Sequence, residues 1–433
     1  MAGDGGSRAR ASIVSVVCGA ALVAAAIVVP HFLDDDVRVH WPPLHADWMP
    51  RFSTMTVVAI IVGVALWYLT LRFARTVSWT ALLLATFAGT WIWTVALAYT
   101  DGSEGLSRVF DRPGEYVYDA QRVDSIPAML REFVDRIPMD AVDNWHTHVA
   151  GHPPGALIFF VILDRLGITS SLDIAFVVVT IGSTAVVAAL VTLRVLGSES
   201  VARSAAPWLI LAPTAVWMGV NGDAVFTAVS AWGLALLAIA AKRHSPAVGV
   251  AAGLLLGLCV YLSYGLVLLG ILSLAVLWIA RSWKPLPWAL LGAGVVVAAF
   301  TLAGFRWWEA YPVLVDRYND GIASERAYGY WVWANVAAWS FTVGVATWAA
   351  FPQAFAAMRR REPLAVLAGA AMVTILLATL SGMSKAEVER IWLPFTLWIV
   401  TIGALLPERW KKPLLLSQVA VAVIVQQLVL TRW

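Results

Sequence analysis

Long apolar segments recur along this 433-residue chain and limit what it can fold into. A helix of roughly 17–25 apolar residues crosses the hydrocarbon of a bilayer, and in lipid its backbone polar groups find partners within the same segment. The composition agrees, since 60% of the residues are hydrophobic, 13% are charged and the mean hydropathy is +0.78. Soluble domains are nearer half apolar and a quarter charged. The sequence therefore predicts an all-α polytopic membrane protein, and it excludes a cytosolic enzyme, a disordered chain and a nucleic-acid binder.

Thirteen apolar runs are predicted to be transmembrane helices. They lie at residues 11–30, 53–72, 77–99, 174–193, 204–220, 223–241, 246–261, 265–280, 286–305, 331–352, 363–380, 391–406 and 413–430. We divide the chain into two N-terminal helices (residues 1–76), a transmembrane core (77–406) and a C-terminal helix (407–433). Polar segments at residues 100–173, 306–330 and 381–390 interrupt the core and are predicted to form its outer loops, with juxtamembrane helices among them.

The distribution of charge predicts the orientation. With the N-terminus in the cytoplasm, the inner side carries sixteen basic and four acidic residues, a net charge of +12, and the outer side carries fourteen basic and twenty-three acidic residues, a net charge of −9. Basic inner loops follow the positive-inside rule. We therefore expect a multi-pass plasma-membrane protein with a cytoplasmic N-terminus and an extracytoplasmic C-terminus. The inner basic residues are Arg8, Arg10, Arg72, Arg75, Arg194, Arg203, Lys242, Arg243, Arg281, Lys284, Arg359, Arg360, Arg361, Arg409, Lys411 and Lys412.

This orientation requires that residues 153–168 do not cross the membrane. The segment opens with His152-Pro-Pro-Gly155 and ends at Asp164 after some nine apolar residues. At 1.5 Å per residue such a helix spans about half a bilayer. It is predicted to be a short helix in or on the outer leaflet.

The first outer loop contains the candidate catalytic base. Asp101 falls at the outer end of the third span, where a carboxylate meets both a lipid headgroup and a water-borne acceptor and can remove a proton from an attacking hydroxyl. The alternative is an interfacial acid that only ends a helix. Glu115 and Tyr116 follow as candidates for donor or acceptor binding. Apolar residues at helical spacing within 126–137 predict an amphipathic helix on the membrane surface.

Three histidines, His146, His148 and His152, lie within seven residues of one another. Three imidazoles can bind zinc, but the HExxH signature of zinc proteases is missing. Hydrogen bonding to a sugar or phosphate, or packing within the loop, are the other interpretations. We predict that these histidines bind the donor or acceptor and that the protein needs no metal or other cofactor, although a divalent metal stays open.

The two later outer loops contain arginine, lysine and aromatic residues at the bilayer edge. Arg317 and Arg326 are candidates for binding a phosphate and a sugar or lipid, with a plain interfacial role as the alternative. Lys385, Glu387 and Arg390 crowd a short loop, where they either clamp a lipid phosphate or form a self-satisfied salt-bridge cluster. Asp223 begins the sixth span and is interpreted as its N-cap.

Taken together, these features resemble the GT-C superfamily of membrane glycosyltransferases. The resemblance lies in the outer acid Asp101, the helix at 126–137, the His152-Pro153-Pro154-Gly155 motif, Asp223 and the basic loop at Lys385–Arg390. It covers about residues 77–406. Because two helices precede the usual first one, Asp34, Asp35 and Asp36 also lie in an outer loop, and they are alternative bases together with Glu115.

The resemblance implies transfer of a sugar, with inversion, from a polyprenyl-phosphate donor to an envelope glycan or glycolipid acceptor on the outer face. By analogy with actinobacterial envelope enzymes, the sugar would be arabinofuranose or mannose. The partners expected are the bilayer, the lipid-linked donor and the glycan acceptor, without nucleic acid. The alternatives are a transporter or flippase of a lipid-linked sugar and a polymerase or ligase of lipid-linked glycans.

Overall fold

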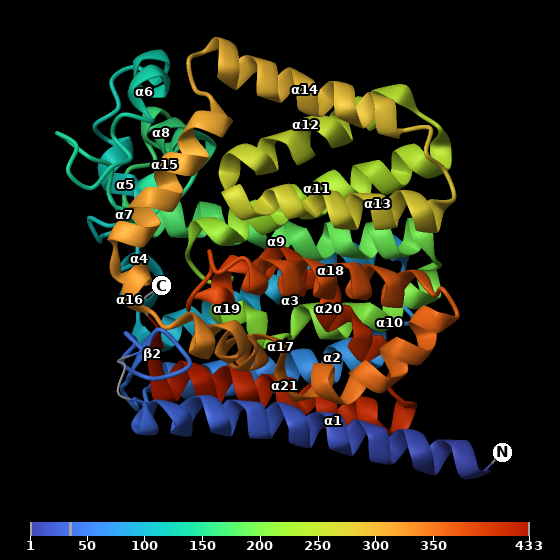
Figure 1. Cartoon of the computed structure of the whole chain (residues 1–433). Coiled ribbons are helices and arrows are strands. Elements are labelled where there is room, and N and C mark those ends of the chain that lie inside the picture. Colours follow the sequence, from blue (N-terminus) through green and yellow to red (C-terminus); the bar gives the residue numbers. More distant parts are fainter. Residues whose placement is uncertain (1, 34–36, 432–433) are drawn as a thin grey trace.

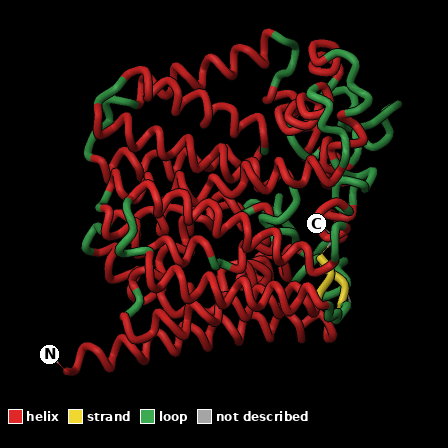
Figure 2. The backbone as a smooth tube through the Cα atoms, turned by 180° about the vertical axis from the view of Figure 1, so that it is seen from behind, coloured by secondary structure: helices red, strands yellow, loops and turns green. Residues whose placement is uncertain are grey.

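Long helices lie side by side in a bundle, and short helices and two strands collect at one end of it (Figure 1). The computed structural model describes residues 2–33 and 37–431. Seen from behind, the longer loops and both strands again lie at one edge of the bundle, and shorter turns and the N-terminus lie at the opposite edge (Figure 2). We call residues 37–53, 99–170, 306–327, 381–392 and 429–431 the loop layer.

The bundle is built from helices of very different length. Its α-helices are α1 (Ala2–Val28), α2 (Thr54–Phe73), α3 (Trp79–Ala98), α9 (Ser171–Leu196), α10 (Glu199–Ile210), α11 (Gly222–Arg243), α12 (Pro246–Leu262), α13 (Leu269–Ala280), α14 (Leu286–Leu302), α17 (Tyr328–Arg359), α18 (Pro363–Leu380), α20 (Leu393–Ile399) and α21 (Glu408–Leu428). Short 3₁₀ segments adjoin them at η1 (Val29–Phe32), η2 (Tyr99–Asp101), η3 (Pro213–Val216), η4 (Tyr264–Leu268) and η5 (Val400–Leu405).

The loop layer contains shorter elements. These are α4 (Glu104–Ser107), α5 (Tyr116–Ala120), α6 (Ile126–Glu132), α7 (Thr147–Ala150), α8 (Pro154–Arg165), α15 (Trp307–Asp320), α16 (Ile322–Glu325), α19 (Val388–Ile391), β1 (Ala46–Trp48) and β2 (Val429–Thr431). The two strands pair antiparallel, with Ala46 opposite Thr431. This pairing joins the loop after α1 to the end of the chain.

Serine residues begin several of the long helices. Ser53, Ser78, Ser170, Ser198 and Ser245 each precede a helix and accept a hydrogen bond from the third backbone N–H of that helix. Such a cap satisfies one of the four N–H groups that have no partner within the helix. The local sequence therefore determines where these helices start.

The predicted all-α membrane fold is confirmed, and each of the thirteen predicted spans overlaps helical structure, although the structure does not confirm thirteen crossings. Among the described residues, seven helices are long and apolar enough to cross a bilayer: α1, α2, α3, α9, α11, α17 and α18. An eighth is formed if α14 and α15, which meet at a bend of 73°, are taken as one span. The other predicted spans fall on α10, α12, α13, α20 and α21, which are shorter, broken or less apolar.

A break within α17 shows how the bundle tolerates irregular backbone. Gly344 has φ 69° and ψ 177°, so the helix is interrupted there. The amide of Gln418 on α21 donates to the carbonyl of Val343 at 2.8 Å and accepts from the N–H of Ala346 at 3.2 Å. Backbone groups left unpaired in a membrane need such partners, and a neighbouring helix supplies them here.

The predicted inner loops meet at the end of the bundle opposite the loop layer, which we call the basic face (residues 73–78, 194–203, 242–245, 281–285, 359–362 and 407–412). Arg75 pairs with Glu408 at 2.6 Å, and Arg203 donates to the carbonyl of Ala74 at 3.0 Å. The hydroxyl of Ser282 lies 3.4 Å from Nδ1 of His244. Chain segments far apart in sequence thus share the face that the charge pattern groups together.

Two predictions for the first outer loop have different outcomes. Residues Pro154–Arg165 form a short helix, α8, about 18 Å long at the usual rise per residue. The helix expected over 126–137 ends at Glu132. The apolar residues of segment 126–137 face protein, since Leu130 within the helix and Phe133 and Ile137 after it are buried and Phe133 packs on Phe305. The amphipathic pattern therefore reflects burial in the loop layer and does not mark a helix resting on the membrane.

Candidate active site in the loop layer

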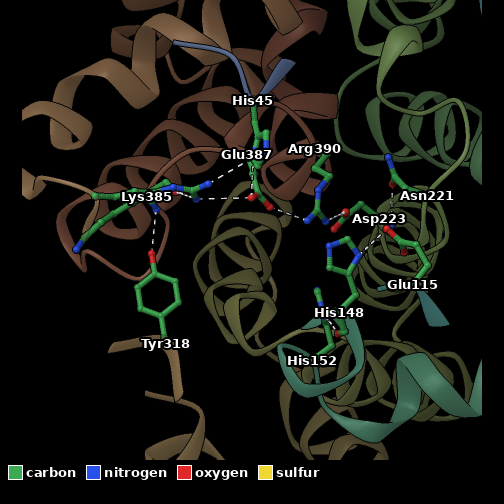
Figure 3. Close-up of polar contacts among 11 residues, drawn as sticks. His45, Glu115, His148, His152, Asn221, Asp223, Tyr318, Lys385, Glu387 and Arg390 are labelled. Carbon is green, nitrogen blue, oxygen red and sulfur yellow. Dashed lines mark hydrogen bonds and ion pairs between the residues drawn. The ribbon is translucent and has the colours of Figure 1, made fainter. Parts of the chain in front are cut away.

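Arg390 lies at the centre of a buried group of charged side chains (Figure 3). It follows Glu389 on α19, and its guanidinium donates to Oδ2 of Asp223 at 2.7 Å and to Oε2 of Glu387 at 2.9 Å. The Arg390 and Asp223 side chains are each only 6% exposed. A buried charge is stable only when it is paired and hydrogen-bonded, so Asp223 and Glu387 together hold Arg390 in place.

The position of Asp223 corrects its predicted role. The N-cap of α11 is Asn221, whose side chain accepts from the N–H of Asp223 at 3.0 Å. Asp223 lies in the first turn, and its carboxylate is left to pair with Arg390. A carboxylate is favoured in the first turn of a helix because the backbone N–H groups there carry partial positive charge.

Glu387 connects Arg390 to the segment before β1. Its Oε1 lies 3.1 Å from Nδ1 of His45 and 3.6 Å from NH1 of Arg326. Burial alone would raise the pKa of Glu387, but the hydrogen bond with His45 and the charges of Arg390 and Arg326 together hold that pKa well below its usual range. Glu387 is therefore ionised at neutral pH, and its ion pairs with Arg390 and Arg326 persist there.

A second acid and base pair lies on the other side of Asp223 (Figure 3). Nδ1 of His148 on α7 is 2.7 Å from Oε1 of Glu115, which precedes α5. His152 is buried against Tyr116, and its Nδ1 lies 2.8 Å from the carbonyl of His148. Burial lowers the pKa of His152 to about 4, so its imidazole is neutral. It therefore holds the turn in place, whereas His148, at 18% side-chain exposure, keeps access to solvent.

Tyr116 packs under this pair. Its ring stacks on Phe160 of α8 at 4.8 Å between centroids, and the residue is 3% exposed. Burial first, and then the charges of Asp223 and Glu115, raise the pKa of its phenol well above 10. The hydroxyl is therefore neutral and suited to hydrogen bonding.

Lys385 lies beside the network. Its ammonium donates to the carbonyl of Ala323 at 3.0 Å, and its N–H donates to the hydroxyl of Tyr318 at 3.2 Å. Arg326 donates to the Lys385 carbonyl at 2.6 Å and links this residue to Glu387. Among the described residues no carboxylate pairs with the Lys385 ammonium. Its positive charge is thus available to an anion.

Asp101 is held by arginines. Arg51 donates to its two carboxylate oxygens at 2.5 and 3.0 Å, and Arg108 lies 3.4 Å from Oδ2. The Asp101 side chain is 10% exposed. A bidentate pair between arginine and a carboxylate is strong and has a fixed geometry. The contact links the segment before α2 to the residues that follow α3. The role of Asp101 as the catalytic base stays a prediction.

His146 and Arg317, two further predicted site residues, make contacts within the loop layer. His146 lies 2.9 Å from Oδ1 of Asp119, and Arg317 donates to the backbone carbonyls of Ile137 and Trp145, the latter at 2.9 Å. Arg317 thereby ties α15 to the loop after α6. The alternative bases Asp34, Asp35 and Asp36 lie outside the described residues. Within the described part of the chain, no group of three or more His, Cys, Asp or Glu side chains is arranged to hold a metal.

Glu389 is a buried acid that the sequence prediction left out of the site. It is 0% exposed, and neither carboxyl oxygen has a hydrogen-bond partner of ordinary geometry among the described residues. Burial raises its pKa to about 7; the nearby backbone N–H groups of Glu389 and His45 oppose this shift, while the charge of Glu387 adds to it. His45 is a second omission. Neither residue belongs to a recognisable sequence motif. The crowding of charged residues at 385–390 is the one feature of the sequence that indicates a role for Glu389.

No protein family matches this sequence, and neither does any curated protein. Among solved structures, ArnT from Cupriavidus metallidurans in the apo state is similar, with 17% identity, a TM-score of 0.48 and coverage of 75% of this chain and 59% of its own. The same protein bound to undecaprenyl phosphate matches with 18% identity, a TM-score of 0.48 and the same coverage. The Archaeoglobus fulgidus oligosaccharyltransferase in complex with Zn and sulfate matches with 14% identity, a TM-score of 0.38 and coverage of 86% of this chain and 51% of its own.

The chain thus spans about half to three fifths of the length of these solved proteins. At these identities and TM-scores they assign neither a family nor a substrate, and the function is argued from the residues of the site.

Proposed function

We propose that this protein is an integral membrane glycosyltransferase of the GT-C type. It transfers a sugar, arabinofuranose or mannose, from a polyprenyl-phosphate donor to an envelope glycan or glycolipid on the extracytoplasmic face, with inversion. One observation carries the proposal. A base paired with a carboxylate, His148 with Glu115, and an unneutralised cation, Lys385, lie on either side of the Arg390 network at the end of a membrane-spanning bundle.

The proposed reaction uses these groups in one step. The acceptor hydroxyl gives its proton to Nε2 of His148, and its oxygen forms a bond to the anomeric carbon. The bond between that carbon and the phosphate oxygen breaks, and polyprenyl phosphate leaves with the electron pair. Glu115 orients His148 through the contact between its Oε1 and Nδ1 of the imidazole, as a carboxylate orients the base in other pairs of this kind.

Lys385 supplies charge for the leaving phosphate. A lysine ammonium is a compact point charge that binds phosphate without fixed geometry. Lys385 follows the end of α18 by five residues, and in this proposal the lipid phosphate arrives from the bilayer at that level. Preorganised charge of this kind lowers the barrier by stabilising the negative charge that develops in the transition state.

The location of the buried charges favours an enzyme over a transporter. Among the described residues, the charged side chains that are buried are Glu115, Asp119, Asp223, Arg326, Glu389 and Arg390. All six lie in the loop layer or at the first turn of α11. A transporter is expected to place its ionisable groups near the middle of the membrane, at interrupted helices.

The test is a glycosyl-transfer assay with the purified protein in nanodiscs. Synthetic polyprenyl-phosphate arabinose and polyprenyl-phosphate mannose are offered with a glycan acceptor, and transfer is followed by mass spectrometry. We expect His148→Gln to lower kcat by roughly 10²–10⁴-fold, the usual contribution of a general base. Glu115→Gln is expected to give a smaller loss, and Lys385→Gln to weaken use of the donor.

Two controls keep the result specific. Arg306→Gln removes a cation from the same layer, where Arg306 forms an exposed pair with Glu309, and we expect it to leave transfer unchanged. Asp101→Asn tests the alternative base. Activity that survives in His148→Gln but collapses in Asp101→Asn, with folding intact, would assign the base to Asp101. Absence of transfer with both donors, combined with movement of the lipid across the bilayer, would contradict the proposed enzyme.

A further inference from the structure

A charged cavity lies at the basic face, at the far end of the bundle from the proposed active site. It is formed where the end of α2 and the linker after it meet α10 and the start of α21, and its volume is about 250 Å³. Its charged lining residues are Arg75, Arg203, Glu408, Lys411 and Lys412. The proposed reaction uses none of them.

Positive charge exceeds negative charge in this cavity. Glu408 is the one carboxylate among the lining residues, and it bridges Arg75 at 2.6 Å and Lys411 at 2.8 Å. Arg203 pairs with Glu199 at 2.6 Å, outside the lining. Lys412 forms no ion pair with any residue that the structure describes. With Arg203 paired outside the lining, Arg75, Lys411 and Lys412 share one carboxylate, and the cavity keeps an excess of positive charge.

The lining also has an apolar side. Trp208 of α10 and Leu415 of α21 close the inner side of the cavity and are almost completely buried, whereas Leu71 of α2 is only half-buried. Free inorganic anions gain nothing from the exposed part of Leu71, whereas a molecule with an anionic head and a hydrocarbon body buries apolar area against it.

The cavity lies at the end of the bundle, where lipid headgroups are expected. α2, which is long and apolar enough to cross a bilayer, ends at Phe73, and α21 begins at Glu408, so the lining residues flank the ends of these two helices. The indole N–H of Trp67 donates to the carbonyl of Lys412 at 2.9 Å. Tryptophan is enriched at this level of a membrane because its ring is apolar and its N–H is polar.

We propose that this cavity binds the headgroup of an anionic phospholipid, with its phosphate beside Arg75, Lys411 and Lys412 and its glycerol and first methylene groups against Leu71. Basic pockets between membrane helices bind such headgroups in general. The bound lipid would bridge α2, α10 and α21 and fasten the N-terminal helices to the last one. This inference is independent of the proposed glycosyl transfer.

The experiment measures lipid binding to delipidated full-length protein in a neutral detergent by native mass spectrometry. The probes are dioleoyl phosphatidylglycerol, dioleoyl phosphatidylcholine and inorganic phosphate. We expect saturable binding of phosphatidylglycerol, with phosphatidylcholine and phosphate far weaker. Lys411→Gln/Lys412→Gln should weaken phosphatidylglycerol binding roughly thirtyfold, from the usual gain per basic residue near an anionic membrane.

The matched control is Lys242→Gln/Arg243→Gln, which removes the same charge at the end of α11 without touching the cavity lining. It should bind phosphatidylglycerol as the unchanged protein does. Equal weakening in both double variants, or none in either, would overturn the proposal, and so would phosphate binding as tightly as phosphatidylglycerol. If the double variant of the cavity fails to fold, the single variant Lys412→Glu replaces it, because Lys412 is exposed and the change should not disturb folding. Reversal of this charge must weaken phosphatidylglycerol binding if the proposal is correct.

Discussion

The buried carboxyl group of Glu389 makes the stability of the protein depend on pH. Its side chain is 0% exposed and its pKa is about 7, against 4.5 for an unperturbed glutamate. Between these two values the folded protein keeps a proton that the unfolded chain has released. The contribution of Glu389 to the free energy of unfolding must therefore fall as the pH rises from 4.5 to about 7, and it levels off above that range.

The size of this effect follows from the two pKa values. A difference of one pKa unit corresponds to 1.36 kcal/mol, so the change from 4.5 to about 7 amounts to about 3 kcal/mol. Glu389→Gln keeps a neutral side chain of nearly the same shape at every pH. Relative to the unchanged protein, this variant should gain about 3 kcal/mol of stability between pH 4.5 and pH 8.

The assay is equilibrium unfolding in mixed micelles of a mild detergent and dodecyl sulfate, read by far-ultraviolet circular dichroism at several pH values from 4.5 to 8. The control is Glu309→Gln, which neutralises a half-exposed carboxylate of the same layer and should show no such gain. A stability difference between Glu389→Gln and the unchanged protein that is the same at pH 4.5 and pH 8 would refute the reasoning.

Two further predictions concern stability and use thermal unfolding in detergent. Gly344→Ala should lower the free energy of unfolding by about 2 kcal/mol or more, because φ is 69° there and the new Cβ would lie 2.2 Å from Oε1 of Gln418. The control is Gly294→Ala in α14, whose new Cβ meets nothing within 4 Å, and this variant should be as stable as the unchanged protein or slightly more stable. A similar loss in both would contradict a strained position. Arg51→Gln removes the bidentate partner of Asp101 and should lower the free energy of unfolding by about 1–3 kcal/mol, as for other hydrogen bonds between charged groups. An unchanged melting temperature would show that the pair does not form.

Some features of this protein follow from the sequence alone. The apolar runs predict the helical segments because a backbone in lipid must satisfy its hydrogen bonds locally. Serine caps mark several helix starts, and the basic loops are grouped correctly onto one face. The loop layer, its short helix α8 and the crowding of charge at 385–390 were also predictable from local pattern.

The partners of the charged side chains depend on the tertiary structure. Arg390 and Asp223 are 167 positions apart, and Glu387 and His45 are 342 positions apart, yet each pair is in contact. No local pattern indicates such pairs, because they form only when separate helices pack and exclude water. The same packing gives Asp101 two arginine partners, whereas it buries Glu389 without a hydrogen-bond partner among the described residues. The sequence thus predicts which residues reach the loop layer, and the packing of the helices determines which of them keep a proton, a charge or an open contact.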